Sequence, residues 1–308
     1  MIKQRTLSSE ISSVGIGLHS GKKIKMTLCP AKENNGITFQ RSDLPNSKPL
    51  KASATSVVVT ENNTAIGSGS SVIHTVEHLM AVLYGLGVSN CHVVLDGPEV
   101  PIMDGSGASF LFLIKEAGIE EQNAEVKVLS VKKEVNVQHQ DKWAKLLPFK
   151  GFQIESSIEF SHPKINFQKF SFDFTVTNFI EDIVRARTFG FLKDVDYLKK
   201  RGLVKGGSLE NAIVLDDFKV LNPEGLRFED EFIRHKILDI VGDLSLLGYP
   251  MAAKVSTSKS GHLLNNKLCL KLLSDQENYQ ILDFSDLEGS YEKSLFDLPF
   301  SYLSTRNI

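Results

Sequence analysis

Three side chains that could bind a metal ion lie close together in one apolar stretch of the sequence. Residues 72–87, VIHTVEHLMAVLYGLG, include His74, Glu77 and His78. The apolar residues recur at helical spacing, which predicts a largely buried helix with these three groups in its first turns. Burying two imidazoles and a carboxylate is unfavourable unless they have partners, and a metal ion would be such a partner.

A second apolar stretch carries a matching set of polar groups. In residues 232–247, FIRHKILDIVGDLSLL, His235, Asp239 and Asp243 lie at positions i, i+4 and i+8. This spacing places them in a row along one face of a predicted helix. Two helices with facing polar rows could enclose one ion, and a further histidine, His262, stands in the nearby turn SGHLLNN.

Four of these groups compete for one metal site. A catalytic zinc takes three protein ligands and keeps a fourth position open, whereas His74, His78, His235 and Asp239 are all candidates. The segment HTVEH also matches the H-x-x-E-H pattern of zinc peptidases, in which both histidines are ligands and the glutamate helps catalysis. That arrangement would leave His235 and Asp239 without a role, and the residue types alone leave both arrangements open.

Composition narrows the class of protein. A chain of 308 residues with 42% hydrophobic and 23% charged residues is typical of a globular protein long enough for two domains. A formal charge of −2 gives no general attraction to nucleic acid. Cys29, Cys91 and Cys269 form no C-x-x-C pair, which indicates a reducing compartment without disulfides. With no signal-like or membrane-spanning segment, we expect a cytoplasmic protein.

The hydrophobic pattern predicts strands and helices in both halves of the chain. Strands are predicted at 4–11, 23–29, 36–40, 56–59, 91–96, 128–137, 144–147, 152–160, 167–174, 212–215 and 252–256. Besides the two histidine-bearing helices, helical stretches are predicted at 108–118, 178–187, 194–200 and 262–273. The polar, unpatterned segment 119–125, IEEQNAE, is the predicted linker between the halves.

Six segments carry a resemblance to a known family. They are GIGLHSG (15–21), TVEHLMAVLYGLG (75–87), DGPEVPIMDGS (96–106), RARTFGF (185–191), GLRFEDEFIRHKILDIVGDLSLLG (225–248) and SGHLLNNKL (260–268). In these segments, and over nearly its whole length, the chain resembles the UDP-3-O-acyl-N-acetylglucosamine deacetylases, zinc hydrolases of lipid A synthesis in Gram-negative bacteria. Six long motifs in the same order make this resemblance specific.

The resemblance implies an α+β fold of two similar domains. Each domain would be a helical layer packed on a β-sheet, with the helices sandwiched between the sheets and the zinc at the domain junction. We expect domain boundaries at 1–124, carrying Glu77 and His78, and at 125–308, carrying His235, Asp239 and His262. A β-α-β-like insert at 192–215 would form an apolar passage for the acyl chain of the substrate.

The resemblance also implies a set of reacting groups. Zn²⁺ would be held by His78, His235 and Asp239, with Glu77 as general base and His262 as general acid. His74 would then be a residue near the site and not a ligand. The position of Asp243, one turn beyond Asp239, suits a carboxylate that keeps His262 protonated and oriented.

Further residues match the substrate contacts of the family. Thr188 would hydrogen-bond the oxyanion, Lys236 would contact the diphosphate, and Phe160 and Phe191 would lie near the nucleotide. The implied reaction releases acetate from a UDP-acyl-sugar, and we expect a monomer with no nucleic-acid partner. Two alternatives stay open at this point: a metallopeptidase of the H-x-x-E-H type, and a non-enzymatic sugar-nucleotide-binding protein with a closed structural zinc.

Overall fold

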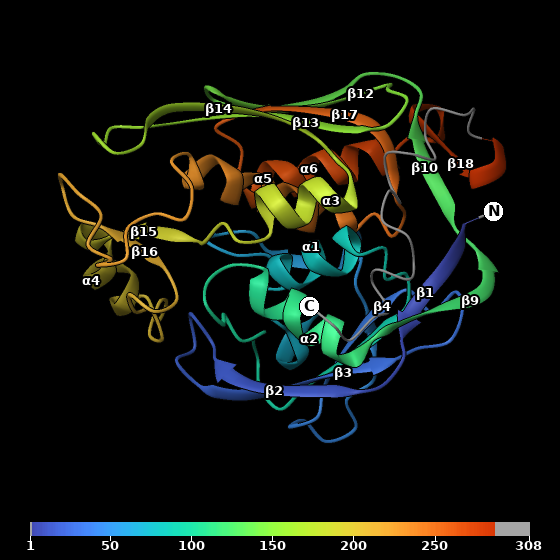
Figure 1. Cartoon of the computed structure of the whole chain (residues 1–308), viewed down its shortest axis with the longest axis horizontal. Coiled ribbons are helices and arrows are strands. Elements are labelled where there is room, and N and C mark those ends of the chain that lie inside the picture. Colours follow the sequence, from blue (N-terminus) through green and yellow to red (C-terminus); the bar gives the residue numbers. More distant parts are fainter. Residues whose placement is uncertain (1, 287–308) are drawn as a thin grey trace.

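Two β-sheets lie on opposite sides of a layer of helices (Figure 1). In the computed structural model, residues 2–286 are described. The six α-helices in this part of the chain are α1 (Glu77–Gly85), α2 (Ala108–Ala117), α3 (Val176–Asn178), α4 (Leu192–Lys200), α5 (Glu231–Ser245) and α6 (His262–Leu273). This arrangement is the expected α+β sandwich, with helices between the sheets.

The first sheet is built from the N-terminal half of the chain. Its strands, in spatial order, are β2 (Ile11–Ile16), β3 (Lys23–Pro30), β8 (Cys91–Leu95), β4 (Ile37–Arg41) and β5 (Leu50–Lys51). Along β3, buried Ile24, Met26 and Leu28 alternate with more exposed residues, so one face of the sheet is apolar. That face joins the same apolar cluster as α1 and α2.

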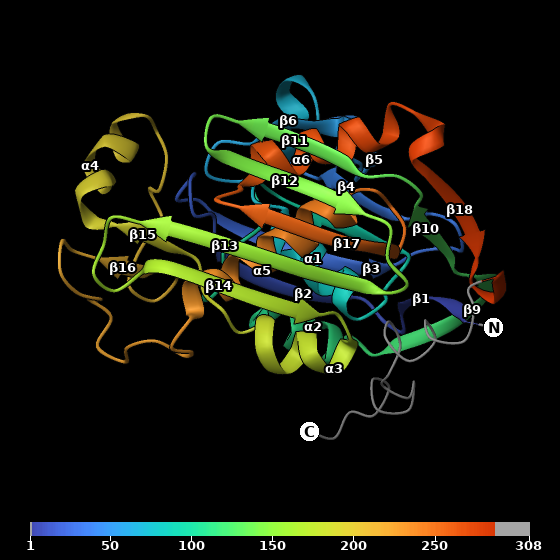
Figure 2. The ribbon, with the colours of Figure 1, turned by 90° about the horizontal axis from the view of Figure 1, so that it is seen from above.

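The second sheet covers the other side of the helices and is seen from above in Figure 2. It contains β11 (Val135–His139), β12 (Lys142–Leu147), β17 (Met251–Ser258), β10 (Lys127–Val131) and β18 (Tyr279–Asp283). Strand β13 (Phe152–Phe160) runs parallel to β17 and pairs on its other side with β14 (Asn166–Asp173). Helices α5 and α6 pack beneath this sheet.

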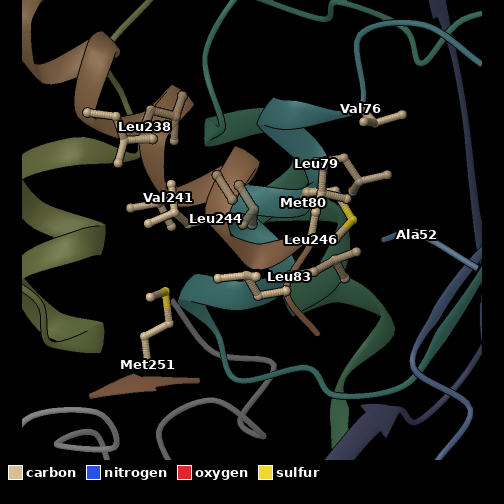
Figure 3. Packing of buried hydrophobic residues seen from close by; sticks show 14 of the residues in the cluster. Ala52, Val76, Leu79, Met80, Leu83, Leu238, Val241, Leu244, Leu246 and Met251 are labelled. Atoms are coloured by element: carbon tan, nitrogen blue, oxygen red, sulfur yellow. The ribbon is translucent and has the colours of Figure 1, made fainter. Parts of the chain in front are cut away.

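Helices α1 and α5 form the contact that joins the two halves. Leu79, Met80 and Leu83 of α1 belong to the same apolar cluster as Leu238, Val241 and Leu244 of α5, and Leu244 lies beside α1 in Figure 3. Each such side chain contributes roughly 1.5–3 kcal/mol when fully buried. At the closest point α5 carries Gly242, where any Cβ would overlap the backbone carbonyl of Glu77.

The predicted acyl-chain insert has the expected β-α-β order. Strand β15 (Phe189–Phe191) leads directly into α4, and the chain returns in β16 (Ile213–Leu215), which pairs with β15 in parallel. Helix α4 contains no fully buried residue and lies at one end of the molecule in both views.

The prediction of a helix over 72–87 is wrong at its start. The helix begins at Glu77, because Thr75 has a φ of 59° and the residues before it are extended. The backbone of His74 accepts from Val100 N and donates to Pro98 O instead of joining a helical turn. His74 is therefore not on the helix that carries Glu77 and His78.

The segment 119–125 is also not an unpatterned linker. It forms β9 (Ile119–Glu125), which pairs antiparallel with β1 (Lys3–Leu7). Pairing with a strand over a hundred residues away cannot be read from local polarity. The remaining short elements are β6 (Val57–Val59) with β7 (Ala65–Ile66), a π-helical turn (Phe179–Ile183) and 3-10 turns at Ala54–Ser56, Gly69–Ser71, Gln276–Asn278 and Phe284–Asp286.

Other predicted elements differ mainly at their boundaries. The strand predicted at 4–11 is two strands, β1 and β2, and that at 128–137 is β10 and β11. The helix predicted at 178–187 is α3 and the π-helical turn, which ends at Ile183. Strand β13 and helix α6 have the predicted bounds.

Replacing Gly242 by alanine should lower the free energy of unfolding by about 1–3 kcal/mol, because the new methyl group overlaps the Glu77 backbone. Helix propensity acts in the opposite direction, because it favours alanine over glycine by about 1 kcal/mol, but the steric overlap is the larger effect. Denaturant unfolding followed by circular dichroism measures the change. In the control Gly190→Ala the added Cβ meets open space, so its effect should stay within about 0.5 kcal/mol. A Gly242→Ala variant as stable as the wild type would contradict the close helix crossing.

Candidate active site

One histidine from α1 meets a histidine and an aspartate from α5. Ligand atoms of His78, His235 and Asp239 all lie within 4.8 Å of one another, and all three residues are buried. Asp239 Oδ1 is 3.5 Å from His78 Nε2 and 3.3 Å from His235 Nε2. Within residues 2–286 this is the one group of three His, Cys, Asp or Glu residues with metal-ligand spacing.

Neighbouring groups orient two of these side chains. Ala186 O lies 3.0 Å from His235 Nδ1, and because a carbonyl only accepts, Nδ1 carries the hydrogen and Nε2 keeps its lone pair. Lys236 Nζ donates to Asp239 Oδ2 at 2.8 Å, which leaves Asp239 Oδ1 for another partner.

The protonation states also suit a cation. Burial lowers the pKa of His235 to about 3, so its imidazole is neutral. Burial acts to raise the pKa of Asp239, but His235, Lys236 and His78 together hold it well below its usual value. Asp239 Oδ1 is buried without a hydrogen-bond partner, which is costly unless a cation lies beside it. The three residues therefore fit a metal ion.

Glu77 borders this group from the first turn of α1. Its Oε2 accepts from the backbone N–H of Thr64 at 3.0 Å, and its Oε1 lies 3.8 Å from His262 Nε2. Burial raises the pKa of Glu77, although His262 and His78 oppose this shift. A carboxylate with one oxygen held and the other facing an imidazole can accept or return a proton.

His262 begins α6 and is held by Asp243. His262 Nδ1 is 2.9 Å from Asp243 Oδ2, and Asp243 also accepts from Thr64 Oγ1 at 2.5 Å and from Asn265 Nδ2 at 2.8 Å. Burial alone would lower the pKa of His262, but Asp243 and, to a smaller extent, Glu77 outweigh it and raise the pKa to about 9. The imidazole is therefore cationic at neutral pH.

One cavity of about 850 Å³ is lined by Glu77, His78, His235, Asp239 and His262, but not by Asp243. Thr188, Phe160, Phe191 and Lys236 line it as well. The Phe160 ring lies 5.8 Å from the Phe191 ring, which places two strands of different sheets at one wall. The site residues that the family resemblance implied therefore lie in this cavity or, for Asp243, in contact with His262 at its wall, whereas the candidate His74 does not line it.

The insert supplies a further wall of this cavity. Val195 and Leu198 of α4 line it, and so does Val214 of β16. Leu18 and His19 from the N-terminal half also line the cavity. Apolar side chains of the insert therefore line the cavity, and an acyl passage in this segment stays a prediction.

Two other histidines do not belong to the group of His78, His235 and Asp239. His74 is absent from the group, so the described residues do not bring together the two histidines of the H-x-x-E-H arrangement. His19 lines the cavity, and its buried Nε2 has no hydrogen-bond partner. Glu99 holds the turn of His19 by accepting from the backbone N–H groups of His19 and Ser20 at 2.8 and 2.9 Å. The sequence prediction assigned no role to His19, although the motif at residues 15–21 contains it.

A family profile described as UDP-3-O-acyl N-acetylglycosamine deacetylase matches residues 4–274. The chain belongs to this family. It is 48% identical over 307 residues to the UDP-3-O-acyl-N-acetylglucosamine deacetylase of Acidithiobacillus ferrooxidans, covering 99% of this chain and 98% of that protein. It is 50% identical over 291 residues to the enzyme of the same name from Actinobacillus succinogenes, covering 94% and 95%. The deacetylase resemblance seen in the motifs is confirmed.

The substitutions His78→Ala, His235→Ala and Asp239→Ala should each reduce the amount of bound metal, because each removes one of the three side-chain atoms that could bind the ion. Metal content per chain after desalting, measured by elemental analysis, checks this. His74→Ala is the matched control and should retain the wild-type metal content. A variant of the group that keeps its full metal content would remove that residue from the site.

Proposed function

We propose that this chain hydrolyses the N-acetyl group of UDP-3-O-acyl-N-acetylglucosamine, giving acetate and UDP-3-O-acyl-glucosamine, an early step of lipid A biosynthesis. The names of the two relatives support this substrate. The observation that carries the proposal is the buried group of His78, His235 and Asp239 at the wall of a cavity that Glu77 and His262 also line. Three ligands beside a cavity favour a catalytic site over a closed structural one.

The metal that we propose is Zn²⁺, held by His78, His235 and Asp239. Imidazole and carboxylate ligands suit zinc, and they also suit iron. When bound, the ion would supply Lewis-acid chemistry, activating water and polarising the amide carbonyl. The protein supplies the ligand orientation, through Ala186 O on His235 and Lys236 on Asp239.

Glu77 is the general base of this proposal. Its Oε2 is occupied by Thr64 N, so Oε1 is the oxygen that takes a proton from the attacking water. Burial raises the pKa of Glu77, which makes the carboxylate a stronger base than an exposed glutamate. The adjacent residue in the chain is the ligand His78, so Glu77 borders the metal position.

His262 is the general acid. Its contact with Asp243 keeps the ring cationic and directs Nε2 towards Glu77, at 3.8 Å from Oε1. The departing amine of the glucosamine needs a proton, which His262 Nε2 donates. Asp243 stabilises the imidazolium without facing the cavity.

The remaining predicted residues bind the substrate in this proposal. Thr188 hydrogen-bonds the oxyanion that forms at the amide carbon. Lys236 contacts the diphosphate, and Phe160 and Phe191 lie beside the nucleotide. Burial acts to lower the pKa of Lys236, but Asp239 outweighs it and raises the pKa, so the side chain stays cationic. The acyl chain occupies the apolar extension lined by α4.

The domain boundary and the surroundings of the protein are also proposals. We place the boundary between residues 124 and 125, at the end of β9. Within residues 2–286, no helix combines the length and apolar character needed to cross a bilayer. We propose a cytoplasmic monomer that acts on a small UDP-acyl-sugar and has no nucleic-acid partner.

Metal-reconstituted protein should release acetate from UDP-3-O-acyl-N-acetylglucosamine, measured by a coupled acetate assay. Glu77→Gln should keep the metal and lose turnover by about 10²- to 10⁴-fold, because it removes the base and no ligand. Metal-loaded wild-type protein that releases no acetate would rule out the proposed reaction.

The rate should depend on pH in a bell shape, with Glu77 ionised and His262 protonated in the active form. Since the pKa of His262 is raised to about 9, the alkaline limb should lie near that pH. Asp243→Asn removes the main group that raises this pKa, so the limb should move to lower pH while the metal stays bound. Profiles of kcat against pH measure the shift, with the surface variant Asp283→Asn as control. A His262→Ala variant with near-normal turnover and an unaltered profile would show that His262 is not the acid.

Shorter 3-O-acyl chains should react less efficiently. Each methylene removed from an apolar passage costs about 0.8 kcal/mol, or about fourfold in kcat/KM. Leu198→Ala, in the cavity wall, should weaken this preference, whereas Tyr197→Ala, on the exposed side of α4, should not. Equal kcat/KM for short and long chains would assign the insert another role.

A further inference from the structure

The first residue of α5, Glu231, is completely buried at the end of the helix that carries the ligands His235 and Asp239. Its Oε1 accepts from the backbone N–H of Arg187 at 3.0 Å and from Arg187 Nε at 2.9 Å, and its Oε2 accepts from Arg187 Nη2 at 3.2 Å. The Arg187 side chain is only 3% exposed. The buried carboxylate of Glu231 therefore accepts hydrogen bonds from both the backbone and the side chain of Arg187.

The backbone N–H of Arg187 belongs to the same peptide unit as the carbonyl of Ala186. This carbonyl is the group that accepts from His235 Nδ1 at 3.0 Å. In a trans peptide the N–H and C=O point in opposite directions, so Glu231 and His235 bind opposite edges of one planar group. The chain of contacts runs from Glu231 through the peptide to His235 Nδ1, and leaves His235 Nε2 for the ion.

We propose that Glu231 and Arg187 are positioning residues that orient and polarise the ligand His235 through the Ala186–Arg187 peptide. In many metal sites a carboxylate binds the ligand histidine directly, which fixes its tautomer and raises its basicity. Here a peptide group stands between carboxylate and imidazole. Hydrogen bonds in such a chain strengthen one another, so the negative charge on Glu231 makes the Ala186 carbonyl a better acceptor. Arg187 holds that carboxylate in place with a forked contact.

The same peptide segment also carries Thr188, which lines the cavity. Thr188 N donates to Gly105 O at 2.8 Å, and Thr188 O accepts from Ile213 N at 2.8 Å. On the other side of Arg187, Ala186 N donates to Ile183 O at 3.0 Å, so the segment is held at both ends and a loss of the contact between Glu231 and Arg187 acts first on the Ala186 carbonyl. This inference rests on the proposed metal site, because the effect is transmitted to a metal ligand.

The test compares metal dissociation constants, measured by chelator competition, for the wild-type protein and the variants Glu231→Gln and Glu231→Asp. We expect about 10- to 100-fold weaker binding in both, because Gln removes the charge and Asp withdraws the carboxylate from the peptide. Glu224→Gln is the matched control, since Glu224 binds the Nη1 of the same arginine but not the peptide, and it should stay within about twofold of wild type. The visible spectrum of the cobalt-substituted protein should change in the Glu231 variants alone.

Folded Glu231 variants with wild-type metal affinity and an unchanged cobalt spectrum would overturn the inference while leaving the metal site intact. Failure of the wild-type protein to bind metal would overturn both this inference and the proposed function. Should the variants not fold, ¹⁵N-histidine spectra of the metal-loaded wild type decide the question. They should show a protonated, slowly exchanging Nδ1 on His235, and metal bound through Nδ1 would contradict the proposal.

Discussion

The close crossing of α1 and α5 is the constraint on which the site depends. His78 comes from one helix and His235 and Asp239 from the other, so the distance between the helix axes sets the distance between the ligands. Gly242 lets α5 approach the Glu77 backbone, one residue before His78. The apolar cluster that contains Leu79 and Met80 of α1 and Leu244 of α5 stabilises the crossing. A change in the packing between the two halves would therefore also change the spacing of His78, His235 and Asp239.

The three buried carboxylates of the site differ in how their oxygens are occupied. Asp239 gives Oδ2 to Lys236 and keeps Oδ1 free, and Glu77 gives Oε2 to Thr64 N while Oε1 faces His262. Asp243 has partners on both oxygens, namely Thr64 on one and His262 and Asn265 on the other. The free oxygens of Asp239 and Glu77 are available to a cation or a proton, whereas Asp243 can act only through His262.

Helical periodicity was enough to predict the groups that lie on one face of a continuous helix. The i, i+4, i+8 row of His235, Asp239 and Asp243 lies on α5, as its spacing indicated. The same reasoning placed His74 on a helix and was wrong, because Thr75 has a positive φ and the strand-like backbone before it pairs with residues 98–100. Local periodicity contains no information about a partner segment that lies twenty or more residues away.

Long-range partners explain the other differences. The segment 119–125 looks like a linker because most of its residues are polar and several are exposed, while its partner strand β1 is at the start of the chain. His19 and Glu231 carry no distinctive spacing, and their surroundings are set by contacts with distant segments, Lys205 for His19 and Arg187 for Glu231. The family resemblance did single out Thr188 and Lys236, which line the cavity, because it compares whole motifs and not the spacing within one helix.

One stretch of chain links the group of His78, His235 and Asp239 to the insert that contains α4. Ala186 O binds the ligand His235, Thr188 lines the cavity, and Phe191 ends the strand that leads directly into α4. At its far end the insert rests on the N-terminal half, where Lys205 N and Gly206 N donate to His19 O and Leu18 O, and Arg201 pairs with Glu61. In the proposed function, an acyl chain bound along the insert would contact both halves of the chain, because Leu198 of α4 and Leu18 of the N-terminal half line the same cavity. Under this proposal, binding energy from the acyl chain would also help to hold the reacting amide in place.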